Sequence, residues 1–315
     1  MIALLKVLVT PRSFGKYSKE PYDHLKEAGI EVVKNLTNGI LKKEQLKDLV
    51  KDVSGVIAGI DPFDLEVLKA APQLVGISKY GVGTDNIDLK YCKQAGIEVT
   101  ITKGANSHAV ADYAFSLMLA AARRVVEIDR GCHIGDWSKK VSKDIFGKKI
   151  GVLGLGAIGK GVIERAKGFQ MDLYGYDIYR DETFIKENQI HFVSVKEIFK
   201  ECDFISIHLP LTKETKHLVD ENMLNLAKPN LVLVNTARGG IIDEEALYHM
   251  LKAGKLLGVG LDVFEHEPAA ESPLLTLPNV IVGSHTAAST IGAVDQMSKM
   301  AVDNIIRIFQ EKGLI

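Results

Sequence analysis

The sequence has few cysteines, no excess of either charge and no long apolar run. Its three cysteines, Cys92, Cys132 and Cys202, stand far apart without C-x-x-C spacing, which argues against a disulfide framework and against a zinc site. Basic and acidic residues number 39 and 40, for a net charge of −1, so bulk charge gives no reason to expect a nucleic acid or an anionic membrane as a partner. The longest apolar run, residues 114–122, is about half the length that crosses a bilayer.

The N-terminal apolar run lacks the marks of a secretory leader. Lys6 interrupts it and no small-residue cleavage site follows, so we expect a first strand there. Together with the isolated thiols, this predicts a cytoplasmic protein. The length of 315 residues, with 46% hydrophobic and 25% charged residues, fits one large or two medium globular domains with ample core.

Short apolar runs alternate with segments of helical period along residues 2–103, a pattern typical of a parallel sheet covered on both faces. A helix is expected to open at Asp61-Pro62, with the aspartate as N-cap and the proline in the first turn. A long apolar helix is expected at residues 106–124. The polar stretch that follows, residues 125–149, contains the only tryptophan, Trp137, and is expected to be irregular.

A glycine-rich turn stands at the centre of the chain. A buried strand at residues 150–153 precedes Gly154, Gly156 and Gly159, in the spacing G-x-G-x-x-G that lets a turn approach the pyrophosphate of a dinucleotide. The helix that follows, residues 160–168, would direct its free N–H groups at the phosphates. A second strand, residues 172–176, leads to Asp177, where an acid binds the hydroxyls of the adenosine ribose. The alternative is a glycine turn with a structural role alone.

The remaining sequence repeats the alternation of strands and helices and closes with a helix over residues 289–312. We therefore predict an α/β protein of two Rossmann-like domains with a cleft between them. Residues 1–103 with 290–315 form a flavodoxin-like substrate domain, and residues 104–289 form an NAD-binding Rossmann domain.

Three residues that could carry chemistry follow strands of the second domain: Arg238, Glu267 and His285. Side chains just past the carboxyl ends of parallel strands line the ligand crevice. A histidine can exchange the proton of a substrate hydroxyl, a carboxylate behind it fixes its tautomer, and an arginine binds a carboxylate. The alternatives are a structural histidine, a solvated turn arginine and a loop acid. No metal is expected, because no residues show metal-ligand spacing.

Motifs at residues 80–88, 106–123, 208–212, 235–247, 261–268 and 284–290 resemble those of the D-isomer-specific 2-hydroxyacid dehydrogenases over nearly the full length. The resemblance implies that Arg238 binds substrate, that Glu267 pairs with His285, and that His285 is the acid/base. It also implies that backbone amides around Val82 and Gly83 hold the substrate carboxylate.

The resemblance further implies NAD as cofactor and a homodimer joined through the NAD-binding domain and residues 125–149. Asp177 should repel the 2′-phosphate of NADP, although Arg180 stands nearby. The implied cofactor contacts are Gly154, Gly156, Ala157, Ile158, Gly159, Asp177, Leu209, Pro210, Thr236, Ala237, Arg238, Asp262 and His285.

The sequence departs from the family pattern at two places, and the second of these bears on the substrate. Asp112 replaces the usual glutamate, and the loop at residues 58–63 lacks an arginine that could bind a phosphate. Lys79, with Lys103 as the weaker candidate, would then have to bind it.

The chain is most similar to short D-3-phosphoglycerate dehydrogenases. This implies oxidation of 3-phosphoglycerate to 3-phosphohydroxypyruvate in serine biosynthesis. The alternatives are a glyoxylate/hydroxypyruvate reductase, a D-lactate-type dehydrogenase and, in a different class, an NAD-sensing protein similar to the co-repressors of this fold.

Overall fold

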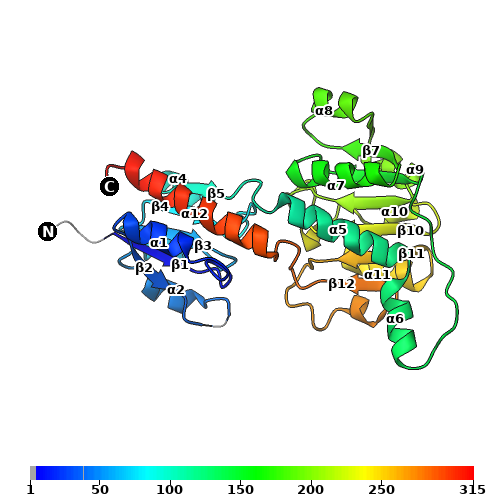
Figure 1. Ribbon diagram of the computed structural model, residues 1–315, viewed down its shortest axis with the longest axis horizontal. Helices are drawn as coiled ribbons and strands as arrows, with labels where there is room; N and C mark the ends of the chain where they lie inside the picture. The colour runs from blue at the N-terminus through cyan, green and yellow to red at the C-terminus, as the bar shows by residue number, and fades with distance from the viewer. Residues whose placement is uncertain (1–4, 38) are drawn as a thin grey trace. The chain divides into compact units, whose positions relative to one another are not determined.

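The structure is a computed structural model that describes residues 5–37 and 39–315. The chain divides into two compact units. Unit 1 comprises Met1–Asn106 and Ser289–Ile315, and unit 2 comprises Ser107–Ala288. Each unit holds one parallel β-sheet with helices (Figure 1), which confirms the predicted α/β class with two Rossmann-like domains.

The sheet of unit 1 has the strand order β2-β1-β3-β4-β5, and its paired strands are all parallel. This is the order of flavodoxin-like folds. Its strands are β1 (Lys6–Val9), β2 (Glu31–Lys34), β3 (Gly55–Ala58), β4 (Gly76–Lys79) and β5 (Glu98–Ile101).

The helices of unit 1 are α1 (Glu20–Glu27), α2 (Lys43–Leu49), α3 (Leu65–Lys69), α4 (Leu89–Ala95) and α12 (Ile291–Glu311). The last of these comes from the far end of the chain and lies against β3, β4 and β5 (Figure 1). It buries one apolar face, which includes Ile305, Ile308 and Phe309. This burial supplies much of the hydrophobic energy that holds α12 on the sheet.

The opening of α3 differs from the prediction. Asp64, and not Asp61, is its N-cap, since the Asp64 carboxylate accepts hydrogen bonds from the amides of Glu66 and Val67. Asp61 is buried and accepts a hydrogen bond of 2.7 Å from the Leu41 amide. The expected Asp-Pro start is therefore wrong, because tertiary structure uses the first aspartate to fix a neighbouring loop.

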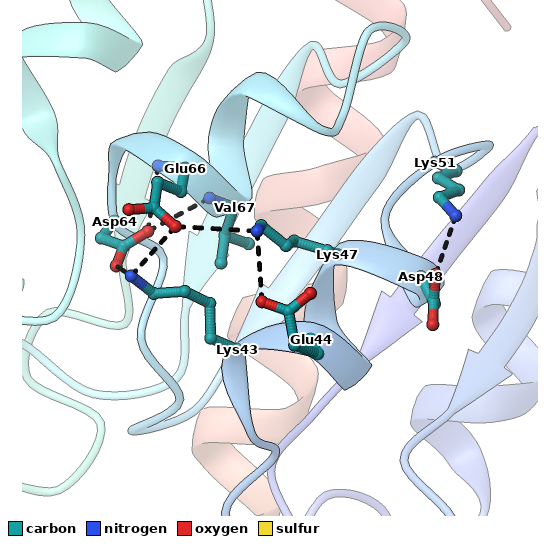
Figure 2. A network of polar contacts seen from close by, with 8 residues as sticks. All are labelled: Lys43, Glu44, Lys47, Asp48, Lys51, Asp64, Glu66 and Val67. Carbon is teal, nitrogen blue, oxygen red and sulfur yellow. Dashed lines mark hydrogen bonds and ion pairs between the residues drawn. The ribbon is translucent and has the colours of Figure 1, made fainter.

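Ion pairs on the surface join α2 to α3 (Figure 2). Lys43 lies 2.7 Å from Asp64 and 3.3 Å from Glu66, and Lys47 lies 3.2 Å from Glu44 and 3.6 Å from Glu66. All five side chains are substantially exposed, so each pair adds little stability on its own.

The sheet of unit 2 has the order β12-β11-β10-β9-β6-β7-β8, and its paired strands are all parallel. The carboxyl ends of these strands therefore share one edge, and the order reverses between β6 and β9, where such sheets bind ligands. The strands are β6 (Lys149–Leu153), β7 (Asp172–Tyr176), β8 (His191–Phe192), β9 (Phe204–Ile207), β10 (Leu231–Asn235), β11 (Leu256–Leu261) and β12 (Val280–Val282).

Helices α5 and α7 pack against each other in unit 2, and α5 also contacts β10 and β11 (Figure 1). The α-helices of this unit are α5 (Ser107–Ala122), α6 (Val125–His133), α7 (Ala157–Gly168), α8 (Glu182–Glu187), α9 (Val195–Glu201), α10 (Glu221–Asn225) and α11 (Glu244–Lys252), with 3-10 turns η1 (Gly239–Ile241) and η2 (Pro273–Thr276). Within the described residues, no helix has both the length and the apolar character needed to span a membrane.

Helix α6 occupies a stretch for which the sequence predicted irregular structure. The prediction is therefore wrong for Val125–His133, and none of the residues of this helix is buried. Arg124 precedes it with a φ of 53°, and its guanidinium donates two hydrogen bonds to Glu127. A local charged contact thus supports the first turn.

Candidate active site

The glycine-rich turn between β6 and α7 is built by close backbone contacts. A Cβ on Gly154 would lie 2.6 Å from the carbonyl oxygen of His208, and one on Gly159 would lie 1.9 Å from that of Gly154. Gly156, by contrast, faces open space and is the N-cap of α7, where no side chain caps the helix. The first amides of α7 are therefore suited to bind a phosphate.

Asp177, at the end of β7, is tied to the same turn. One carboxylate oxygen accepts from the Leu155 amide at 2.7 Å, and the other accepts from the Tyr179 amide at 3.0 Å. Each carboxylate oxygen can accept a further hydrogen bond, so Asp177 can still bind ribose hydroxyls. Arg180 pairs with Glu182 at 2.7 Å and stacks over Phe192.

A buried hydroxyl at the end of β10 also suits a bound polar group. Thr236 is 8% exposed, and its Oγ1 makes no hydrogen bond with any residue that the structure describes. Buried polar atoms of native proteins are nearly always paired. The orphan hydroxyl and the glycine turn at one sheet edge thus fit a dinucleotide. Leu209 is buried and Pro210 is exposed just beyond β9, at the same edge.

The predicted catalytic residues come together at this edge. Nδ1 of His285 lies 2.9 Å from Oε2 of Glu267, and Oε1 of Glu267 accepts from the Phe264 amide at 3.0 Å. Burial alone would raise the pKa of Glu267, but the hydrogen bonds from His285 and Phe264, and the charge of Arg238, outweigh it and hold the pKa below the usual range. Glu267 is thus an ionised partner for the histidine.

The backbone of His285 is held by Asp262. The Asp262 carbonyl accepts from the His285 amide at 2.8 Å, and its carboxylate accepts from the amides of Thr286 and Ala287 at 2.9 and 2.8 Å. His285 has a φ of 57°, a left-handed conformation that is unfavourable for a histidine and needs such support. Burial raises the pKa of Asp262, against these amide hydrogen bonds. Sequence reasoning named Asp262 as a cofactor contact and missed this positioning role.

Asn235 shapes the turn that carries Arg238. Its amide nitrogen donates to the Arg238 carbonyl at 2.8 Å, and its Oδ1 accepts from the Ala237 amide at 3.0 Å. The Arg238 guanidinium in turn donates to the carbonyl of Ala237. Sequence reasoning did not single out Asn235. The available signal was an asparagine that ends a buried strand, where its side chain can form an Asx turn.

The predicted substrate residues lie in unit 1. Lys79 ends β4, is 5% exposed, and donates a hydrogen bond to the carbonyl of Gly59. Val82 is 41% exposed, and among the described residues the amides of Val82 and Gly83 donate no backbone or side-chain hydrogen bond. Two such amides in an exposed loop are suited to an anion. The roles of these three residues stay predictions.

No group of three His, Cys, Asp or Glu side chains within the described ranges could hold a metal ion.

The sheet order and glycine turn make unit 2 a Rossmann domain that binds a dinucleotide. Residues 115–287 match the family described as D-isomer specific 2-hydroxyacid dehydrogenase, NAD binding domain. The chain is 42% identical to a glyoxylate reductase of Korarchaeum cryptofilum over 272 residues, which cover 84% of this chain and 82% of that protein.

Two further relatives extend the comparison. A D-3-phosphoglycerate dehydrogenase of Methanocaldococcus jannaschii is 38% identical over 312 residues, 98% of this chain and 58% of the relative. The structure of D-lactate dehydrogenase from Aquifex aeolicus, complexed with NAD and lactic acid, aligns with a TM-score of 0.84 at 29% identity and covers 98% of this chain and 96% of that one.

The chain therefore belongs to the D-isomer specific 2-hydroxyacid dehydrogenases. It is an NAD-dependent oxidoreductase that acts on the CH–OH group of hydroxy acids. The resemblance inferred from the sequence motifs and the expectation of NAD are confirmed.

Proposed function

We propose that this enzyme reduces a short unphosphorylated 2-oxo acid, glyoxylate or hydroxypyruvate, with NADH. The observation that supports this choice is the state of Lys79, the cation expected to bind a phosphate, which is buried and engaged with the Gly59 carbonyl. The loop at residues 58–63 supplies no arginine in its place. The 42% identity to a glyoxylate reductase points the same way.

In this proposal His285 exchanges the proton of the substrate. Because Nδ1 contacts Glu267, Nε2 is the nitrogen left to give a proton to the carbonyl oxygen during reduction and to take it back during oxidation. Arg238 binds the substrate carboxylate and polarises the neighbouring carbonyl. In unit 1, the amides of Val82 and Gly83 are the proposed substrate contacts. The bound nicotinamide supplies the hydride.

The second candidate is D-3-phosphoglycerate dehydrogenase. It is favoured by the relative that matches 98% of this chain and by the presence of a lysine at the end of β4.

A substrate panel distinguishes these functions. We would compare kcat/KM for glyoxylate, hydroxypyruvate, 3-phosphohydroxypyruvate and pyruvate, each with NADH and NADPH. The proposal expects the highest kcat/KM for glyoxylate or hydroxypyruvate with NADH. A preference for 3-phosphohydroxypyruvate would establish the second candidate, and a preference for pyruvate would indicate a D-lactate-type enzyme. NAD binding without turnover of any acid would indicate a sensor.

We also propose a homodimer formed through residues 125–149 of unit 2. Six large apolar side chains of this segment are exposed, and the four most exposed are Ile134, Trp137, Val141 and Phe146, at 85, 81, 87 and 64%. Apolar side chains gathered on one exposed segment are typical of an interaction surface. Light scattering should show a dimer for the wild type and a monomer for W137D combined with I134D.

A further inference from the structure

We propose that Glu244, the first residue of α11, is a positioning residue that holds the backbone beneath the Glu267–His285 pair. This inference rests on the proposed roles of Glu267 and His285. The loop concerned, residues 264–267, follows β11 and carries Glu267, and Glu244 belongs to a different segment of unit 2.

The contact that carries the proposal is a short hydrogen bond. Oε1 of Glu244 accepts from the Glu265 amide at 2.6 Å. The preceding amide, that of Phe264, donates to Oε1 of Glu267 at 3.0 Å. The two amides are consecutive in the chain. Glu244 fixes the Glu265 amide, and the Phe264 amide fixes the carboxylate of Glu267. A shift of the Glu265 amide would move the Phe264 amide, and with it the carboxylate that orients His285.

The same loop rests directly on the turn that carries Arg238. A Cβ on Gly239 would lie 1.9 Å from the carbonyl carbon of Phe264 and 2.3 Å from the nitrogen of Glu265. The Glu265 side chain pairs with His217 at 2.8 Å, and the His217 amide donates to the carbonyl of Gly240 at 2.8 Å. Three contacts therefore hold the loop, and Glu244 supplies the hydrogen bond to the Glu265 amide.

Glu244 is not needed to begin its own helix. Asp243 is the N-cap of α11, and its carboxylate accepts from the amides of Glu245 and Ala246. Burial raises the pKa of Glu244, so keeping a carboxyl group here has an electrostatic cost. The Glu244 carboxyl group accepts a hydrogen bond from the Glu265 amide. We therefore assign it the role of an acceptor for that loop.

Glu245 offers a matched control. It is the next residue of the same helix, its side chain is 88% exposed, and its contact in the structure is a distant one of 4.0 Å to His249. A change there tests for general effects of altering the first turn of α11.

The experiment compares E244M, which removes the acceptor at similar length, with E244Q, which keeps an oxygen, and with E245M. Activity is measured on the 2-oxo acid that the wild type reduces best, and NADH binding by fluorescence titration. We expect kcat of E244M to fall about 10- to 100-fold, the effect of a misplacement near 1 Å, with KM and the Kd for NADH within about twofold. E244Q should keep kcat within about threefold, and E245M should match the wild type.

A kcat of E244M equal to that of the wild type would overturn the inference, and so would an E244Q as impaired as E244M. If E244M does not yield folded protein, E244D takes its place, because its oxygen falls one methylene short of the Glu265 amide and the same loss is expected. A wild type that reduces none of the acids contradicts the proposed function instead, so the two failures are distinguishable.

Discussion

Both units have a parallel sheet, but the groups at the carboxyl edges of the two sheets differ in how they are held. At the edge of unit 2 the groups of the proposed site are fixed by hydrogen bonds: Glu267 by His285 and the Phe264 amide, and the backbone at His285 by Asp262. At the edge of unit 1 the expected substrate groups are two loop amides and one buried lysine. We expect the groups of unit 2 to determine the reaction. We expect the few contacts of unit 1 to determine which acid binds.

This difference predicts where substitutions should act. A change in the fixed network of unit 2 removes interactions that operate in the transition state, so it lowers kcat. A change at the edge of unit 1 alters substrate binding, so it raises KM for some acids and not for others.

The largest effect is expected for H285Q. Glutamine cannot exchange the proton, and loss of a general acid/base costs about 10²- to 10⁴-fold in kcat. Steady-state kinetics with the best 2-oxo acid would measure this, with the Kd for NADH expected to stay within about threefold. H249Q, a change at an exposed histidine of the same unit, is the control. Retention of full kcat by H285Q would contradict the proposed mechanism.

The common location of Arg238, Glu267 and His285 could be predicted from the sequence, because each stands within a few residues after an apolar strand. In a parallel sheet that fact alone places the three at one edge. The glycine turn could also be predicted, because its spacing reflects a steric requirement. A Cβ at Gly154 or Gly159 would collide with the backbone. These are local signals that the fold preserves.

The features that the sequence did not reveal depend on contacts between distant segments. Asp262 and Glu244 hold amides 24 and 21 residues away, and no spacing rule predicts such pairs. The sequence predicted Asp61 as a helix N-cap, but its carboxylate accepts a hydrogen bond from the Leu41 amide. Helix α6 buries none of its residues, and the sequence predicted irregular structure there. Substrate choice was least predictable, because the proposal for it depends on a single contact, the hydrogen bond of Lys79 to the Gly59 carbonyl.

The second prediction concerns acid stability at the edge of unit 2. His208 follows β9, its Nε2 contacts the Ser206 hydroxyl at 2.8 Å, and burial of the ring lowers the pKa to about 3. The unfolded chain binds a proton to this histidine below about pH 6.5 and the native protein does not. The free energy of unfolding should therefore fall as the pH drops below 6.5, by up to about 1.4 kcal/mol for each pH unit.

Urea unfolding followed by fluorescence between pH 7.5 and 5 would measure this dependence. H208Q cannot titrate in this range, so its free energy of unfolding should depend less on pH than that of the wild type. H249Q, at an exposed site, should leave the wild-type slope unchanged. Equal slopes for H208Q and the wild type would show that His208 is not the responsible group.

The third prediction addresses unit 1 and substrate choice. A hydrogen bond from a charged group contributes about 1.5–3 kcal/mol, so K79M should raise KM for 3-phosphohydroxypyruvate about 10- to 100-fold if Lys79 binds the phosphate. KM for glyoxylate, which has no phosphate, should change about threefold or less. K103M is the control for the weaker candidate lysine. A KM for the phosphorylated acid that K79M leaves unchanged would remove Lys79 from phosphate recognition and strengthen the proposal of an unphosphorylated substrate.

The smallest effect is expected away from both edges, in the ion pairs that join α2 to α3 (Figure 2). Lys43 and Lys47 are partly exposed, and solvent and salt screen such pairs. K43M and K47M should each lower the melting temperature by at most about 2 °C, and the difference from the wild type should shrink in 1 M NaCl. Neither variant should alter kcat or KM, because these pairs lie on the surface between two helices, while the proposed substrate contacts follow β4. A change in substrate preference in K43M would show that the surface between α2 and α3 affects substrate binding, which would contradict its purely structural role.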